Sequence, residues 1–241
     1  MRALSLFALA TATAGLAAAP LLSQGGSGNN SVELGAEDLL SLYYAELRAE
    51  GGLPVAPPNV SLAPESTITR LAFGSCNHQL RSQHMWGQIS ATNPDLFLFI
   101  GDNNYGDNGW SGDAGLTSLR EAYAVQAATP ELSEFRAQIP MMVTWDDHDY
   151  GMNDGGGNFA FRGWAETLFE TFWGSSEEAR SRPGIYDSAM FGPDGQRTQV
   201  ILLDTRFFRS DLETMEYTPE RPPLGPYIPV SYTHLTLPTK A

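Results

Sequence analysis

Four short apolar runs, each followed by polar side chains, constrain the fold of this chain more than any other feature. The runs cover residues 71–73, 96–100, 141–145 and 200–203. Uncharged runs of this length are typical of buried strands. Helical spacings of apolar residues lie between them, at about 82–92, 116–128 and 159–172. Strands that alternate with helices predict an α/β protein built on a layered sheet.

Local patterns predict two further elements. The runs 184–191 and 196–203 are separated by the turn-forming sequence GPDG, which predicts an antiparallel hairpin. Residues 33–50 have a helical apolar spacing that ends in two glycines. We therefore expect one helix ahead of the sheet, joined to it by the proline-rich stretch 53–65.

The residues that follow the four runs are of types that bind metals or phosphate. They include Cys76, Asn77, Asp102, Tyr105, Asp146, Asp147, His148, Asp149, Asp204 and Arg206. Ligands of open α/β sheets bind at the carboxyl ends of the strands. A carboxylate placed there is partly buried, so it is costly unless it is paired or bound to a metal. The sequence therefore predicts a ligand site at this edge of the sheet.

This mixture of side chains suits two cations of different hardness. A thiolate with a phenolate and a carboxylate suits Fe(III) or Zn²⁺, whereas carboxylates and amides alone suit Ca²⁺, Mn²⁺ or Mg²⁺. In the hydrolysis of a phosphate ester, two cations help a water to attack phosphorus and neutralise the charge that develops on the phosphoryl oxygens. A neighbouring imidazole can protonate the leaving oxygen.

Four linked motifs carry a resemblance to a known family. They are FGSCN at 73–77, GDNNYGD at 101–107, WDDHD at 145–149 and LDTR at 203–206. In order and spacing they resemble the alkaline phosphatase D (PhoD-like) family of calcineurin-type metallophosphoesterases, over about residues 70–211. The resemblance implies an α/β fold in which a layered β-sandwich is flanked by helices.

The resemblance also implies roles for single residues. Cys76 and Tyr105 would bind Fe(III), and Asp102 would bridge both metals and take part in catalysis. Asp147, which stands where the wider superfamily has a metal-binding asparagine, would bind the second metal, Ca²⁺, with Zn²⁺ or Mn²⁺ as alternatives. His148 would lie beside the phosphate and act on the leaving group or the transition state.

Other polar residues near the motifs are candidates for a supporting role. Asn77, Asp146, Asp149 and Asn153 are candidates for supporting the metal ligands. Arg206 either orients phosphate or forms a structural salt bridge with an acidic loop, and the sequence leaves both readings open. By contrast, His78 and His84 are interpreted as surface or capping residues.

The N-terminus and the overall charge predict an exported protein. Residues 1–19 have the pattern of a secretory signal peptide, with an uncleaved anchor as the alternative. We therefore expect a secreted or periplasmic protein with no membrane segment beyond this leader. The formal net charge of −14 offers no basic patch for nucleic acid. Cys76 is the single cysteine, so no disulfide can form within the chain.

The expected domain organisation follows from these boundaries. Residues 20–66 would form a linker and the N-terminal helix, and residues 67–229 a partial PhoD-like metallophosphatase domain. In that family the chain continues well beyond the LDTR strand, and later strand ends supply further metal ligands. We therefore expect an incomplete second half of the fold with an exposed strand edge, and a non-native tail at 230–241 that includes His234.

Taken together, the sequence predicts an exported metal-dependent hydrolase of phosphate mono- or diesters. Its substrate could be a small molecule or a polymer. A non-catalytic exported metal-binding protein is the first alternative, because the acidic loops would serve it equally well. A metal-dependent hydrolase of another ester class and an inactive fragment of the phosphatase are the others. The sequence does not predict the oligomeric state.

Overall fold

The structure is a computed structural model that describes residues 34–214 and 227–229. The expected signal peptide, the linker up to residue 33 and the expected tail at 230–241 lie outside these residues. The chain divides into the units Met1–Gly35 and Ala36–Ala241, and the helices and strands of the described residues lie in the second. The described residues include no helix that is long and apolar enough to cross a membrane.

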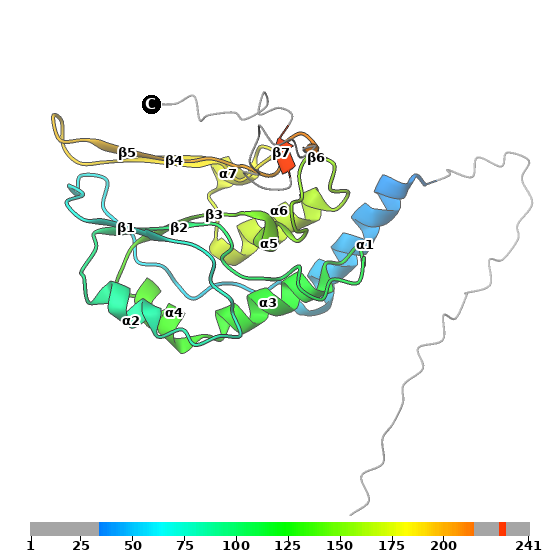
Figure 1. The fold of residues 1–241 in the computed structure, drawn as a ribbon, viewed down its shortest axis with the longest axis horizontal. Helices are drawn as coiled ribbons and strands as arrows, with labels where there is room; N and C mark the ends of the chain where they lie inside the picture. The colour runs from blue at the N-terminus through cyan, green and yellow to red at the C-terminus, as the bar shows by residue number, and fades with distance from the viewer. Residues whose placement is uncertain (1–33, 215–226, 230–241) are drawn as a thin grey trace, which may run out of the picture. The chain divides into compact units, whose positions relative to one another are not determined.

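A parallel sheet of three strands forms the centre of the fold (Figure 1). Its order is β1 (Leu71–Gly74), β2 (Leu96–Ile100) and β3 (Met141–Thr144). Phe73 pairs with Leu98 and Ile100 with Thr144, so the three carboxyl ends meet at one edge. The α/β class and these three strands are therefore confirmed.

Helices connect the strands and follow them. They are α1 (Ala36–Gly51), α2 (Met85–Ser90), α3 (Thr117–Ala127), α4 (Pro130–Arg136), α5 (Asp147–Tyr150), α6 (Arg162–Trp173) and α7 (Glu177–Arg180). The helices expected near 33–50, 82–92, 116–128 and 159–172 are confirmed with shifted ends. The sequence interpretation missed α4, α5 and α7. Pro130 begins α4, a position that suits proline because its missing N–H would have no partner within the helix.

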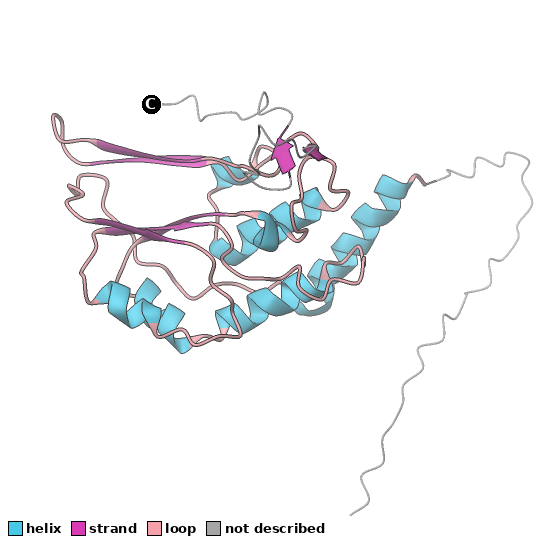
Figure 2. Ribbon diagram, in the orientation of Figure 1, coloured by secondary structure: helices cyan, strands magenta, loops and turns pink. Residues whose placement is uncertain are grey.

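The sheet lies between helices on one face and a hairpin on the other (Figure 2). Side chains alternate along a strand, so neighbours point to opposite faces. Phe97 and Phe99 pack with Trp86 of α2 and Phe135 of α4 in one buried cluster. Leu96 packs on the other face with apolar residues of the hairpin. That hairpin is β4 (Asp187–Phe191) with β5 (Thr198–Leu202), antiparallel as predicted.

A third core lies beneath the loop that follows β3. Helix α6 supplies Trp164, Leu168, Phe169 and Phe172, whose spacing places them on one face of the helix. They pack with residues of α3 and with Trp145, the first residue after β3. This aromatic core gives the loop after β3 a firm support.

Two expectations about the strands need correction. The run 71–73 is not buried, because Leu71 is 44% and Phe73 70% exposed at the edge of the sheet. Among the described residues, the run 200–203 pairs only with β4 and stands outside the parallel sheet, with Ile201 43% exposed. Apolar runs predict strands, but whether a strand is buried depends on the layer that covers it. A further pair, β6 (Leu212–Thr214) and β7 (Tyr227–Pro229), was not anticipated.

Candidate metal centre

The loops after β1 and β2 stay paired beyond the ends of their strands. The Cys76 N–H donates to the Gly101 carbonyl at 3.3 Å, and the Asn77 N–H donates to the Asp102 carbonyl at 2.8 Å. Cys76 and Asp102 both have left-handed backbones, with φ of 59° and 48°. Such conformations cost about 1–3 kcal/mol each for residues with side chains, and they cluster at functional sites.

A third loop reaches the same place from β3. Gly101 has φ of 106°, and a Cβ on it would lie 2.6 Å from the Asp146 Cβ. Only glycine therefore allows the loop after β2 to approach the loop after β3 this closely. The carboxyl ends of all three strands thus bring their polar residues to one place.

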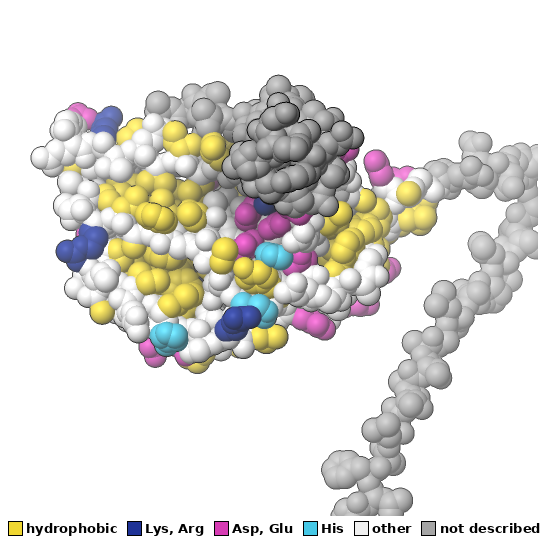
Figure 3. Space-filling view, viewed as in Figure 1, with side chains coloured by type: hydrophobic (Ala, Val, Ile, Leu, Met, Phe, Trp, Pro, Cys, Tyr) yellow, Lys and Arg dark blue, Asp and Glu magenta, His cyan; other side chains and the backbone are white. Residues whose placement is uncertain are grey.

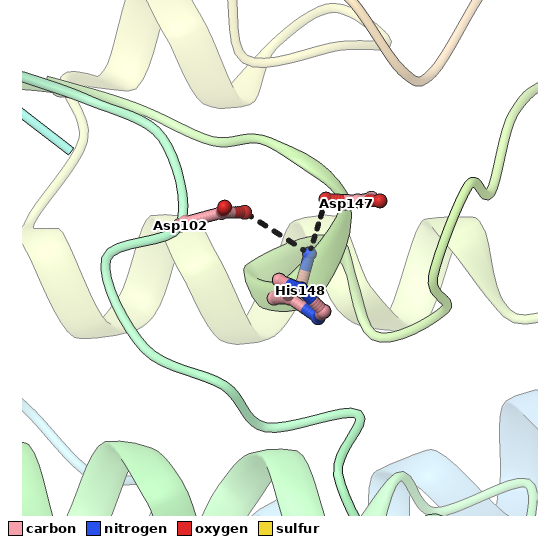
Figure 4. A group of neighbouring side chains, drawn as sticks. All are labelled: Asp102, Asp147 and His148. Atoms are coloured by element: carbon pink, nitrogen blue, oxygen red, sulfur yellow. Dashed lines mark hydrogen bonds between the residues drawn. The ribbon is translucent and has the colours of Figure 1, made fainter. Parts of the chain in front are cut away.

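Asp102, Asp147 and His148 form a compact group in which the ligand atoms lie within 4.8 Å of one another (Figure 4). Asp102 comes from the loop after β2, and Asp147 and His148 lie on α5. The His148 N–H donates to Asp102 Oδ1 at 3.4 Å and to Asp147 Oδ1 at 3.1 Å. Both carboxylates are only 9% exposed. Two nearly buried carboxylates this close together fit a bound cation.

Cys76 and Tyr105 stand beside this group. The Cys76 thiol donates to Asp102 Oδ2 at 3.4 Å, and it is also hydrogen bonded to the Tyr105 phenol. Burial, this hydrogen bond and the charge of Asp102 raise the pKa of Tyr105 to about 12. A thiol and a phenol next to carboxylates are the donors that suit Fe(III) or Zn²⁺. The donor set therefore fits the metals that the resemblance implies.

The two carboxylates of the group differ in their electrostatics. Burial and the neighbouring Asp147 charge raise the pKa of Asp102, although the Cys76 hydrogen bond opposes them. Burial also acts to raise the pKa of Asp147, but a hydrogen bond from the Asp154 N–H and the charge of Arg206 outweigh it and lower that pKa. The protein's own groups thus favour the charged form of Asp147 more than that of Asp102.

His148 is oriented by a residue that the sequence interpretation did not single out. Its Nδ1 lies 2.7 Å from Asp107 Oδ1, and the Asp107 side chain is only 7% exposed. Burial raises the pKa of Asp107, and the hydrogen bond to His148 counteracts this. The contact fixes the ring, and Nε2 is the ring nitrogen that Asp107 does not contact. Asp107 is the last residue of the GDNNYGD motif, and its place in that motif is the sequence signal that could have identified it.

Asp149 connects the loop after β2 to the loop after β3 through hydrogen bonds. It is fully buried, and its carboxylate accepts from the Asn103 N–H at 3.1 Å, the Asn103 Nδ2 at 2.6 Å and the Asp146 N–H at 2.7 Å. Burial raises its pKa well above the usual range despite these bonds. Asp149 also completes the capping box that begins α5 at Asp146. Asp149 therefore has a structural task and lies behind the group of Asp102, Asp147 and His148.

The other supporting candidates have different surroundings. Asn77 is buried, and its Nδ2 donates to the Asn103 carbonyl at 3.4 Å. Asn153 is exposed and bonds to its neighbour Asp154, so the structure does not bring it into the cluster. Instead the Asp154 N–H donates to Asp147 Oδ2 at 2.8 Å.

Arg206 reaches the site from the end of β5. Its guanidinium pairs with Asp146, and its Nη2 lies 3.8 Å from Asp147 Oδ1. The Arg206 N–H donates to Asp204 Oδ1 at 2.9 Å, and the same oxygen accepts from Trp145 Nε1 at 2.9 Å. The salt bridge to the acidic loop, one of the two readings left open, is therefore present. A contact with phosphate stays a prediction.

A recess adjoins the cluster on the side of Arg206. Its volume is about 450 Å³, and Ile100, Asp146, Leu203 and Arg206 contribute to its walls. Figure 3 shows acidic side chains gathered in a hollow of this face with histidine side chains next to them. The recess places open space next to Arg206 and Asp146.

The two histidines interpreted as surface or capping residues differ. His84 is exposed, and its Nδ1 lies 3.0 Å from Ser82 Oγ. His78 does accept a backbone N–H, from Leu80 at 3.3 Å, but its ring also stacks on Tyr105 with centroids 5.2 Å apart. The interpretation therefore holds for His84 and misses the contact that His78 makes with the site.

A family model and a solved structure each match part of this chain. The model of a family described as PhoD-like phosphatase matches residues 71–154. A solved structure titled "Structure of PhoD" is 19% identical with a TM-score of 0.48, and covers 67% of this chain. The match spans 34% of that structure's own chain, about a third of its length. No curated protein matches. Over residues 71–154, which include Cys76, Asp102, Tyr105, Asp147 and His148, the resemblance to the PhoD-like phosphatase family is therefore confirmed.

Proposed function

We propose that this chain carries the metal centre of an exported hydrolase of phosphate mono- or diesters. One observation carries the proposal: Asp102, Asp147 and His148 converge within 4.8 Å at the strand ends, inside the segment that matches PhoD-like phosphatases. Export rests on the signal-peptide pattern of residues 1–19. The substrate is a small or polymeric phosphate ester, and the net charge of −14 disfavours nucleic acid as a partner.

The donor set supports a proposal for which residues would hold which metal. Cys76, Tyr105 and Asp102 would hold Fe(III), and Asp102 with Asp147 would hold Ca²⁺, with Zn²⁺ or Mn²⁺ as alternatives. When bound, such cations supply Lewis acidity for attack by water and offset the negative charge of the phosphate. An acidic site needs them, because the carboxylates alone would repel the substrate.

The protein's own groups then have distinct tasks. His148 offers its Nε2 to the leaving oxygen, while Asp107 at Nδ1 orients the ring. Arg206 lies on the wall of the recess and close to Asp147, where it can hold a phosphoryl oxygen. Asp146 keeps the guanidinium in place through its ion pair.

We further propose that the parallel sheet and the β4–β5 hairpin are the described part of a calcineurin-type β-sandwich. The support is the buried contact of Leu96 in β2 with Val200 and Leu202 in β5, which places two sheets face to face. The domain boundary at residue 67 is part of the same proposal.

The test is hydrolysis together with metal content. The purified protein, without residues 1–19, is assayed on bis-(p-nitrophenyl) phosphate, p-nitrophenyl phosphate and p-nitrophenyl acetate, and its metals are measured by elemental analysis. Asp102→Asn should abolish phosphate ester hydrolysis and release metal. Asp194→Asn, in the exposed hairpin turn where the Asp194 side chain is 89% exposed, should change neither.

Other outcomes separate the alternatives. Retained metal with no hydrolysis of any ester would favour a metal-binding protein or an inactive fragment. Cleavage of the acetate alone would favour a hydrolase of carboxylic esters. Phosphate ester hydrolysis that survives Asp102→Asn would overturn the assigned site.

A further inference from the structure

We infer that His78 is a positioning residue of the metal centre that holds the ring of Tyr105 in place. This inference rests on the proposed function, because it assigns His78 a task within the same site. The Tyr105 ring contacts two imidazoles at once. Its centroid lies 5.2 Å from that of His78, with 13° between the planes, and 4.1 Å from that of His148, with 34° between the planes.

The imidazole of His78 is fixed by its own loop. The Leu80 N–H donates to His78 Nδ1 at 3.3 Å. The His78 carbonyl accepts from the Arg81 N–H at 2.9 Å and from Gln83 Nε2 at 3.1 Å. Gln83 is buried and also accepts from Trp86 Nε1 in the core beneath the sheet. His78 is therefore a fixed surface against which another ring can rest.

The same loop contacts Tyr105 at two points. His78 stacks on the ring. Gln79 Oε1 accepts the Tyr105 backbone N–H at 2.9 Å. The loop after β1 thus determines both where the Tyr105 backbone lies and where its phenol oxygen points.

The stack has a consequence for the metal that Tyr105 would bind. A stacked aromatic pair favours one ring orientation by roughly two- to tenfold over a free side chain. Without His78, the ring would turn between rotamers, and the phenol oxygen would spend less time beside Cys76 and Asp102. Fe(III) affinity should then fall by the same factor, although His78 itself contributes no ligand.

The experiment compares three variants of the full chain. His78→Ala removes the ring, and His78→Phe keeps a flat ring but no ring nitrogen. His84→Ala removes an exposed imidazole from the same loop that does not touch Tyr105. Each protein is titrated with Fe(III) nitrilotriacetate, and the tyrosinate-to-iron charge-transfer band is followed without any substrate. We expect His78→Ala to weaken binding two- to tenfold and to shift the band, while the other two variants match the wild type.

Two results would overturn the inference. If His78→Ala binds Fe(III) with the affinity and band of the wild type, the stack positions nothing. If His78→Phe binds as weakly as His78→Ala, a ring nitrogen, and not stacking, is the active feature.

Failure of the proposed iron site gives a different result, namely no charge-transfer band even in the wild type. In that case the ring contact is measured directly by NMR of protein with ¹³C-labelled tyrosine, with the Tyr105 signal assigned by Tyr105→Phe. His78→Ala should shift or broaden that signal and His84→Ala should not. An unchanged Tyr105 signal in His78→Ala would again overturn the inference.

Discussion

The carboxyl edge of the sheet is built in the opposite way to its open face, by which we mean the part of the hairpin side that stays uncovered at β1. At the carboxyl edge, carboxyl groups such as those of Asp102 and Asp149 are nearly or fully buried and accept hydrogen bonds from backbone N–H groups. On the open face, Leu71 is 44%, Phe73 70% and Ile100 42% exposed, and Figure 3 shows apolar side chains gathered where the strands lie. Burying charge is costly, and exposing a cluster of large apolar residues is unusual.

This difference separates what folds the chain from what builds the site. Stability comes from the covered faces of the sheet, where Phe97 and Phe99 meet helices and Leu96 meets the hairpin. The geometry of the site depends on hydrogen bonds between loops and on residues with left-handed backbone conformations at the strand ends. Loss of a polar group at the carboxyl edge should therefore matter more than loss of an apolar group on the open face.

The covered part of the sheet and its open face give the largest expected contrast. Phe97→Ala should lower the free energy of unfolding by about 3–5 kcal/mol, because it leaves a cavity in the cluster with Trp86 and Phe135. Phe73→Ala should change it by less than about 0.5 kcal/mol, because that side chain is already mostly in water. Urea unfolding followed by circular dichroism measures both. Equal losses would mean that Phe73 is covered in solution and that the comparison of faces is wrong.

Asp149 tests the buried polar bonds of the carboxyl edge. Asp149→Ala should cost about 2–4 kcal/mol of unfolding free energy, since the N–H groups of Asn103 and Asp146 would lose their buried acceptor. The same urea titration applies. Asp194→Ala, in an exposed turn, is the control and should be neutral. A neutral Asp149→Ala would show that the two loops hold together without this carboxylate.

Asp107 tests whether the polar network serves the chemistry and not only the fold. Asp107→Asn should lower kcat for bis-(p-nitrophenyl) phosphate by about 10–100-fold, because an orienting partner of an active-site imidazole is lost. Metal content and unfolding free energy should stay close to those of the wild type. If kcat is unchanged, His148 does not act through the ring orientation seen here.

Glu166 sharpens the comparison with a buried carboxyl away from the site. Burial is the main cause that raises its pKa from 4.5 to about 7, opposed by a hydrogen bond from the Gly184 N–H. Because the folded-state pKa is the higher one, the stability that this group contributes is fully present below about pH 4.5 and is lost as the pH rises through about 7.

Glu166→Gln should therefore stabilise the protein by roughly 1–2 kcal/mol at pH 8, a value reduced for partial exposure, and leave it unchanged at pH 4. Thermal unfolding at both pH values measures this. Glu178→Gln, on the exposed side of α7, provides the matched control. An equal effect at the two pH values would contradict the raised pKa of Glu166.

The elements that the sequence predicted are those whose pattern is local. The apolar runs located β2 and β3, the sequence GPDG located the hairpin, and the spacing from Trp164 to Phe172 located α6. Helix α4 also had a local signal in Pro130 that was not used. The exposure of β1 had none, because it depends on how far the hairpin extends over the sheet.

The same distinction between local and non-local sequence signals applies to the candidate site. The motifs correctly indicated that residues after different strands lie together, because parallel strands end at one edge. The contact of His148 with Asp107, 41 residues earlier, and that of Tyr105 with His78 depend on the directions of side chains across loops. The exposure of Asn153 likewise depends on the path of the loop after α5, which no residue pattern specifies.

The central claim is that the strand-end loops hold a metal between Cys76 and the carboxylates. X-ray absorption at the iron edge, on protein loaded with Fe(III), tests it most directly. A metal held in this way should have one sulfur in its first coordination shell, replaced by oxygen in Cys76→Ser. A shell of oxygen and nitrogen alone in the wild type, with no change in Cys76→Ser, would contradict it.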